Sequence, residues 1–342
     1  GSMTSYVEGL SISGVSGLTI QDVYMENLYM GLKLQGADTG AKNEGVNVNN
    51  LKVYNTRNPL YMSSTNNFSM SNSILDASGG GTKFLHASYF RGGVSNLYFN
   101  NVQFNNTPGG GIHIYNSKPE LAAPRDIVFE NCSIDNTRAA VYLYSNTSNI
   151  TFNNLSIKNS GLGFKVNSAS QIAMNGVSIT NASSSKEEKG GFSLNNFTNS
   201  QLDNVTIDGS SLAGSVFALI GGVSGITATN FNATNIGSVP FTNSSSAVDS
   251  MEAVNLAISS SYSTGYKVTG TAVPVPPPTT EATTEATTEA TTEVITEPPT
   301  QTTTELTTEP TTEITTVPPT TETTTEPVVI IKKPRPTKPS RR

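Results

Sequence analysis

Five side chains capable of acid–base chemistry or ring stacking recur at one place in short apolar segments. Lys33, Tyr61, His113, Tyr142 and Lys165 each lie between two apolar residues, in "LKL", "LYM", "IHI", "VYL" and "FKV". In an extended segment the middle residue faces away from its two neighbours, so all five are expected to point to solvent. A row of amines, imidazole and phenols can bind hydroxyls or carboxylates and can stack on sugar rings.

Charged side chains gather in three long segments that follow the apolar ones, "QGADTGAKNEG", "HASYFRGGV" and "YNSKPELAAPR". Long connections on a repetitive scaffold are where binding usually resides, so we expect one charged flank beside the row. Its members are Asp38, Lys42, Glu44, His86, Arg91, Lys118, Glu120 and Arg125, and the row itself continues with a residue near Leu85, with Ser193 and with Lys267. Variable loops without function, and the preference of exposed strands for Tyr and Lys, would give the same pattern.

The elements that position these side chains are short strands in a repeat. The stretch "SNLYFNNVQFNN" has two alternating apolar runs joined by an Asn bend, and nine further copies align with it, among them "GVNVNNLKVYN" and "DIVFENCSIDN". Successive copies begin 22 to 30 residues apart, a period typical of a solenoid. Their first inward residues are Leu18, Val46, Phe68, Leu97, Ile127, Ile150, Ile172, Ser200, Ile226 and Met251.

Asparagine recurs at two bends of the repeat. The fifth position holds Asp22, Asn50, Asn72, Asn101, Asn131, Asn154, Gly176, Asn204, Asn230 and Asn255, and a second turn follows at Asn27, Asn55, Asn106, Asn136, Asn159, Asn181 and Asn235. Asn and Gly tolerate the left-handed backbone that a tight bend needs. Stacked from coil to coil, these side chains can form amide ladders.

With "GLKL", "PLYM" and "GIHI" as third strands, each coil has three strands separated by Asn bends. This pattern resembles the pectate-lyase-like superfamily over roughly residues 8 to 270. The resemblance implies an all-β fold, a single-stranded right-handed parallel β-helix of about ten coils with Asn ladders. Lyases, glycoside hydrolases, phage tailspikes and non-catalytic surface proteins share that fold, so the fold does not decide the activity.

One segment also resembles a catalytic motif. "GLKLQG" is similar to the Gly-Phe-Lys-Leu segment of one pectate lyase family, which implies Lys33 as the base that removes a proton from a uronate, assisted by calcium in an aspartate cluster. The aspartate motif that should precede it is missing, and "GFKV" repeats the lysine at Lys165. A calcium-free lyase would use His113 beside Tyr142 or Tyr61. The row holds no pair of carboxylates for glycoside hydrolysis.

Composition divides the 342 residues into a body and a tail. We expect a tag or N-terminal lead at 1–7, the β-helix at 8–271, a disordered Thr/Pro/Glu-rich linker or stalk at 272–327, and a basic, Pro-containing tail at 328–342. The body has 14 Lys or Arg against 16 Asp or Glu, which does not favour nucleic acid as a partner. Cys132, the sole cysteine, falls on an inward position. No apolar run is long enough to span a membrane.

These observations favour an extracellular, cell-surface β-helix module that binds polysaccharide or acts as an adhesin without catalysis and without cofactor or metal. Its binding residues would be Lys33, Tyr61, His113, Tyr142, Lys165 and Arg91. The first alternative is a pectate-lyase-like polysaccharide lyase with calcium, in which Lys33, His113 or Tyr142 is catalytic. The second is a phage tailspike-like fibre. We expect a monomer whose partner is a polysaccharide or cell-surface glycan.

Overall fold

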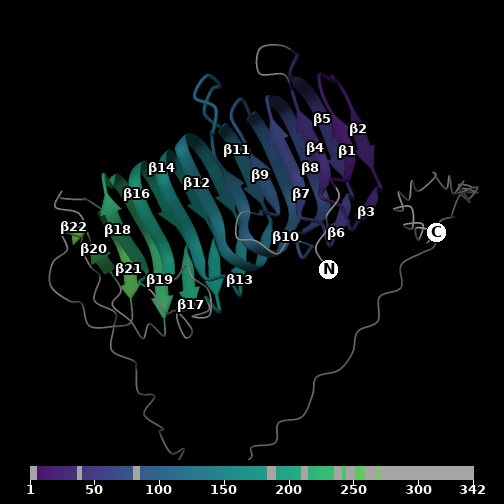
Figure 1. Cartoon of the computed structure of the whole chain (residues 1–342). Helices are drawn as coiled ribbons and strands as arrows, with labels where there is room; N and C mark the ends of the chain where they lie inside the picture. Colours follow the sequence, from purple (N-terminus) through teal and green to yellow (C-terminus); the bar gives the residue numbers. More distant parts are fainter. Residues whose placement is uncertain are drawn as a thin grey trace, which may run out of the picture. The chain divides into compact units, whose positions relative to one another are not determined.

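The computed structural model describes residues 6–36, 41–79, 85–182, 190–208 and 215–234, and three short strands at 241–243, 251–258 and 268–269. The expected all-β fold is confirmed, because parallel strands stack coil upon coil into one β-helix (Figure 1). The part of the chain that is described contains strands, bends and turns and no helix. In those same residues, no helix is therefore long and apolar enough to cross a membrane.

The strands alternate between the faces of the coil, and the longer ones continue through a bend from one face to the next. In the N-terminal half they are β1 (Glu8–Ile12), β2 (Thr19–Gln21), β3 (Tyr24–Glu26), β4 (Met30–Gln35), β5 (Asn43–Asn49), β6 (Lys52–Tyr54), β7 (Asn58–Ser63), β8 (Thr65–Asp76), β9 (Ser88–Phe90), β10 (Ser95–Ile114) and β11 (Arg125–Glu130). They continue with β12 (Ser133–Asn153), β13 (Ser156–Lys158), β14 (Leu162–Asn175), β15 (Ser178–Thr180), β16 (Gly190–Asp203), β17 (Thr206–Asp208), β18 (Phe217–Gly221), β19 (Ser224–Thr234), β20 (Phe241–Asn243), β21 (Met251–Ile258) and β22 (Val268–Thr269).

The inward residues of successive coils lie on top of one another. Leu97 pairs in parallel register with Phe68 of the preceding coil and with Ile127 of the next. Phe99 and Phe129 stack with ring centroids 4.9 Å apart and nearly parallel planes, so the interior is filled by columns of like side chains. Cys132 is 2% exposed in this core, as its inward position predicts, and burial raises its thiol pKa to about 11.

The two predicted Asn bends are confirmed by the backbone. In the first row φ lies between 50° and 55° at the eight positions from Asp22 to Asn230 other than Gly176, and in the second row it lies between 45° and 59° from Asn27 to Asn181. The side chains also bond from coil to coil: Asn101 Nδ2 donates to Asn72 Oδ1 at 2.9 Å, and Asn136 Nδ2 donates to Asn106 Oδ1 at 3.0 Å. Asn235 lies outside the described residues, and only the backbone of Asn255, in β21, is described.

A third bend row, which was not predicted from the sequence, leads each coil into its first strand. Its residues also have positive φ, and they are Gly17, Gly45, Asn67, Asn96, Asp126, Asn149, Gln171, Asn199 and Gly225. Each directly precedes the first inward residue of a repeat. All but Gln171 are Gly, Asn or Asp, the residue types that most readily adopt left-handed backbone. The residue types at this position therefore also indicate a bend.

Two details of the predicted coil differ. The β-helix has about seven turns rather than ten. Beyond Thr234 the described residues form the strands β20, β21 and β22. In the third coil the last strand is β9, so the outward residue of that strand is Tyr89, while Leu85 is buried. The stalk and tail predicted at 272–342 lie outside the described residues, and their boundaries stay predictions.

Candidate functional site

The predicted row of outward side chains is continuous along one face of the β-helix. In parallel register it runs Lys33, Tyr61, Tyr89, His113, Tyr142, Lys165 and Ser193. Tyr89 takes the rung that was expected near Leu85. Ser88 and Phe90 are both fully buried, so the residue between them has to face outward. Lys267, the last predicted member, lies outside the described residues.

Lys33, at the N-terminal end of the row, is engaged in an ion pair. Its Nζ lies 2.8 Å from Glu8 Oε1, and this hydrogen bond lowers the pKa of the Glu8 carboxyl. The two acids that precede Lys33 in sequence have other partners: Asp22 Oδ1 accepts from Asn50 at 2.6 Å and Glu26 Oε2 accepts from Tyr24 at 2.8 Å. These three carboxylates have separate partners and do not fit a calcium site beside Lys33.

The described residues hold no group of three or more His, Cys, Asp or Glu side chains placed to bind a metal ion.

Arg91 reaches the row from the connection after β9. Its Nη1 donates to the Tyr61 hydroxyl at 2.8 Å and its Nε donates to Ser117 Oγ at 2.9 Å. Tyr61 is 8% exposed and its ring centroid lies 5.7 Å from that of Tyr89. Burial raises the pKa of the Tyr89 hydroxyl to about 12, although the nearby Arg91 charge acts in the opposite direction. This part of the row is therefore a packed pair of phenol rings, and the Tyr61 hydroxyl accepts a hydrogen bond from the Arg91 guanidinium.

The centre of the row is a contact between two histidines. His86 lies just before β9, and its Nε2 is 2.5 Å from Nδ1 of His113 in β10. The Gly110 backbone N–H donates to His86 Nδ1 at 2.8 Å. Burial, with a smaller contribution from the His113 charge, lowers the pKa of His86 well below its ordinary value, and burial lowers the pKa of His113 to about 3. Both imidazoles are therefore neutral at neutral pH.

Aromatic rings surround the two histidines. The His113 ring centroid lies 5.0 Å from that of Tyr89, 5.1 Å from that of Tyr142 and 5.7 Å from that of Tyr144. Tyr142 is 5% exposed, so most of its ring serves as packing rather than as an open surface. Gly110 makes this packing possible, because a Cβ there would lie 2.5 Å from Tyr142 Cδ2.

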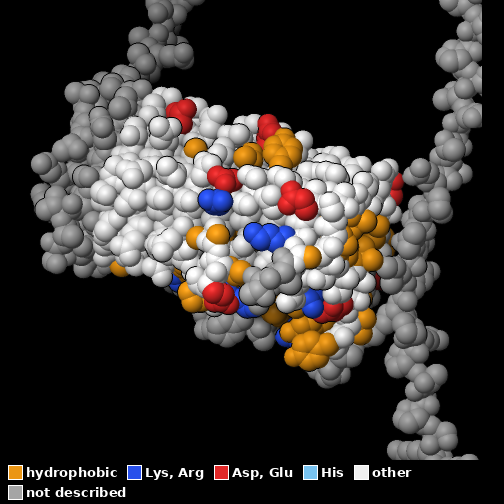
Figure 2. Space-filling model, turned by 90° about the horizontal axis from the view of Figure 1, so that it is seen from above, with side chains coloured by type: hydrophobic (Ala, Val, Ile, Leu, Met, Phe, Trp, Pro, Cys, Tyr) orange, Lys and Arg blue, Asp and Glu red, His pale blue; other side chains and the backbone are white. Residues whose placement is uncertain are grey.

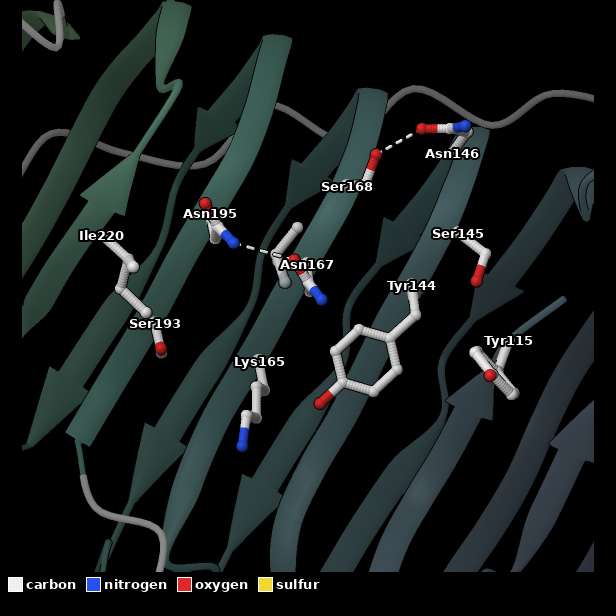
Figure 3. Close-up of a pocket in the computed structure, with 11 residues that line it drawn as sticks. Tyr115, Tyr144, Ser145, Asn146, Lys165, Asn167, Ser168, Ser193, Asn195 and Ile220 are labelled. Carbon is white, nitrogen blue, oxygen red and sulfur yellow. Dashed lines mark hydrogen bonds between the residues drawn. The ribbon is translucent and has the colours of Figure 1, made fainter. Parts of the chain in front are cut away.

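Two adjoining recesses open along this face. The smaller, of about 290 Å³, is lined by His86, Tyr89, His113, Tyr115 and Tyr144. The larger, of about 700 Å³, shares Tyr115 and Tyr144 and continues past Lys165, Asn167, Ser193 and Asn195 (Figure 3). We call the two together the tyrosine groove. Its linings come from successive coils, so the groove follows the axis of the β-helix.

The far end of the groove is polar. Asn195 Nδ2 donates to Asn167 Oδ1 at 2.8 Å, and Ser168 donates to Asn146 (Figure 3). Lys165 Nζ lies 5.9 Å from the centre of the Tyr142 ring. The groove therefore passes from aromatic and imidazole groups to amides, hydroxyls and one amine.

Tyr115 and Tyr144 were not predicted as site residues. In "IHIY" and "VYLY" they follow the row residues His113 and Tyr142 by two positions, which puts them on the same outward side. Tyr115 is 36% exposed and is the most open ring of the groove. Continuing the alternation by one more residue would have identified both.

Two members of the predicted charged flank, Glu44 and Arg125, occupy the same register position in their coils, with Asn66 and Ser95 between them. Glu44 belongs to β5 and accepts from Asn66 at 3.0 Å, and Arg125 begins β11 and pairs with Asp126 at 3.5 Å. Asp38 lies outside the described residues. Of the eight predicted members, Arg91 and His86 reach the row. Figure 2 shows scattered single charges over a mostly uncharged surface in that view.

No protein-family model matches the chain, and no curated protein sequence matches it. A solved structure that is similar is the catalytic domain of a GH87 alpha-1,3-glucanase in complex with nigerose, with 13% identity and a TM-score of 0.29. The match covers 72% of this chain and 53% of that one, so the chain spans about half the length of the glucanase domain.

Proposed function

We propose that the protein is an extracellular, cell-surface module that binds one polysaccharide chain along the tyrosine groove without cleaving it. The observation that carries this proposal is the tyrosine groove itself, which crosses several coils along the axis of the β-helix. Stacked coils lie about 4.8 Å apart, close to the length of one sugar residue, so each rung can meet one sugar. Tyr115 and Tyr144 offer ring faces, while Asn167, Asn195 and Lys165 offer hydrogen-bonding groups.

Two features support the lyase alternative, in the pectate-lyase-like superfamily: the "GLKLQG" segment and the position of His113 beside Tyr142. A catalytic base needs a free lone pair, whereas the Lys33 amine is ion-paired with Glu8. Asp22 and Glu26, which precede Lys33 in sequence, have other partners, and the described residues hold no group of three or more acids, histidines or cysteines placed to bind a metal ion. Binding without catalysis is therefore the better supported function. The Thr/Pro/Glu-rich segment would hold the module away from the cell surface.

A glycan array with wild type, Tyr144→Ala and Tyr98→Ala tests the proposal. Tyr98 is a matched control, because it is 39% exposed but lies on the first strand of its coil, away from the groove. We expect Tyr144→Ala to weaken retention about tenfold, which corresponds to about 1.4 kcal/mol, and Tyr98→Ala to leave it unchanged. Equal retention by all three proteins would refute the groove as the binding site.

The same samples decide between binding and cleavage. Pectate and alginate are incubated with the protein, with and without calcium, and unsaturated products are followed by ultraviolet absorbance. Under the proposed function no product accumulates. Product that forms with wild type and disappears with Lys33→Ala would establish the lyase instead.

A further inference from the structure

The two histidines form a hydrogen-bond chain with one direction. An amide N–H donates and cannot accept, so the bond from Gly110 requires that His86 Nδ1 carry no proton. A neutral His86 ring then carries its proton on Nε2. His86 therefore donates this proton to His113 Nδ1, 2.5 Å away. The backbone of Gly110 sets the tautomer of His86, and His86 sets that of His113.

His113 is left with its proton on the other ring nitrogen. Its Nδ1 accepts from His86, so the neutral ring holds its hydrogen on Nε2. This Nε2 is buried, and it has no hydrogen-bond partner among the residues that the structure describes. A buried donor without an acceptor is unfavourable, and native proteins satisfy nearly all such groups. An acceptor from outside the described chain would remove this deficit.

We propose that Gly110 and His86 fix His113 as an Nε2–H donor, and that this N–H forms a subsite for an acceptor oxygen of the bound glycan. The proposal rests on the proposed function, since His113 lines the smaller recess of the tyrosine groove. The acceptor is a hydroxyl, ring or carboxylate oxygen of a sugar whose face packs on Tyr115 or Tyr144. Rotation of these two side chains, which also line the recess, gives the oxygen its access.

The tautomers of the two histidines also determine whether His113 can act as a general base. A general base at His113 would need its lone pair at Nε2 and its proton at Nδ1. That tautomer would turn the His86 proton to Nδ1, where it would face the Gly110 N–H. His113 is therefore a donor at this position and not a base. Its contribution is to choose which sugar oxygen can lie in the recess.

The tautomers can be measured directly, because the chain has two histidines. Long-range nitrogen–proton NMR of the labelled protein distinguishes a protonated ring nitrogen from an unprotonated one. We expect both histidines to have the proton on Nε2 at neutral pH, and His86→Leu to make His113 a mixture of tautomers. A free protein in which His113 carries its proton on Nδ1 overturns the tautomer assignment, whatever the glycan result.

The subsite is tested by titrating the same protein with cellohexaose and with a galacturonate hexamer. We expect the His113 Nε2 resonance to shift together with those of the groove tyrosines. Tyrosine shifts without any change at His113 would overturn the subsite and leave the proposed function standing. A titration in which neither glycan moves any groove resonance would count against the proposed function and the subsite together, while the tautomers are still decided by the free protein.

Two substitutions separate hydrogen bonding from packing. In His113→Gln the side-chain amide keeps an N–H donor near the position of Nε2, whereas His113→Leu fills similar space without a donor. We expect glycan affinity to fall about tenfold in His113→Leu and to be largely restored in His113→Gln. Wild-type affinity in His113→Leu would show that the N–H contributes nothing.

Discussion

His86 and His113, the two histidines of the chain, are 27 residues apart in sequence, yet their ring nitrogens lie 2.5 Å apart. They meet because His86 precedes β9 and His113 lies in β10, the next coil. Both rings are enclosed by tyrosines. The two histidines of the chain therefore meet in one contact, at the aromatic end of the tyrosine groove.

The first prediction concerns acid stability. The pKa of each histidine is lowered in the folded state, so the unfolded chain binds more protons once the pH falls below about 6.5. The contribution of His113 is complete above about pH 6.5 and is lost as the pH falls toward about 3, and the contribution of His86 is likewise lost on the acid side of its ordinary pKa. We expect the free energy of unfolding to drop by up to about 1.4 kcal/mol per pH unit for each histidine. Urea unfolding across this window measures the slope.

The groups facing the pair are Tyr89, Tyr115, Tyr142 and Tyr144, with Arg91 and Lys165 further along the row. Phenols, guanidinium groups and amines ordinarily titrate far above pH 6.5. The double variant His86→Gln, His113→Gln therefore separates the contribution of the two histidines to the pH dependence of the unfolding free energy from that of the carboxylates elsewhere. A variant whose slope equals that of wild type would contradict the prediction.

The second prediction concerns Gly110. In Gly110→Ala the new Cβ would lie 2.5 Å from Tyr142 Cδ2, so the ring has to move. We expect a loss of about 1–3 kcal/mol in unfolding free energy, measured by urea titration. Tyr142→Leu provides the rescue, because it removes the clashing ring. The double variant is expected to lose less than the sum of the two single variants, and strict additivity would show that the strain lies elsewhere.

The third prediction concerns the Asn bends. Asn101 has φ of 55° and bonds to Asn72 of the preceding coil. Asn101→Ala introduces left-handed strain and removes the ladder bond, so we expect a cost of about 1–3 kcal/mol. Asn101→Gly relieves the strain and loses only the bond, and it should cost less. Thermal unfolding compares the two, and a larger loss for Gly than for Ala would argue against backbone strain as the cause.

The fourth prediction compares two lysines of the row. Lys33 pairs with Glu8, and the two side chains are 21% and 33% exposed, whereas Lys165 lines the larger recess. We expect Lys33→Ala to change stability by less than about 1 kcal/mol and to leave glycan retention unchanged. Lys165→Ala should weaken retention without an equal loss of stability. Affinity electrophoresis measures the glycan retention of both variants. A greater loss of retention in Lys33→Ala than in Lys165→Ala would place the binding site nearer the N-terminal coils.

Sequence predicted the fold because its determinants are local. An inward apolar residue and an Asn bend recur in each repeat, and each can be recognised within a few residues. Once the register was known, the order of Lys33, Tyr61, His113, Tyr142 and Lys165 along one face followed from alternation alone. The third bend row could have been predicted in the same way, from Gly, Asn or Asp at one position of the repeat.

The site was predicted less completely, for physical reasons that differ from residue to residue. Tyr89 was missed because one of its inward neighbours is Ser88, whose hydroxyl is satisfied by the Gly111 carbonyl at 3.0 Å, so the apolar pattern fails there. His86 was missed in the row because it lies outside a strand. The partner of Lys33 was missed because Glu8 belongs to a coil that precedes the first recognised repeat.

Because the coils pair in parallel register, the length of the groove is set by the number of coils. Each coil pairs with its immediate neighbours, so its contacts span one turn of sequence, and a whole turn could be removed while the bends and the core on either side keep their partners. Such a deletion would shorten the groove by one rung of about 4.8 Å. Under the proposed function, the shortest glycan that binds with full affinity would then be one sugar shorter. The number of coils that line the groove would therefore determine the number of sugars that the protein binds.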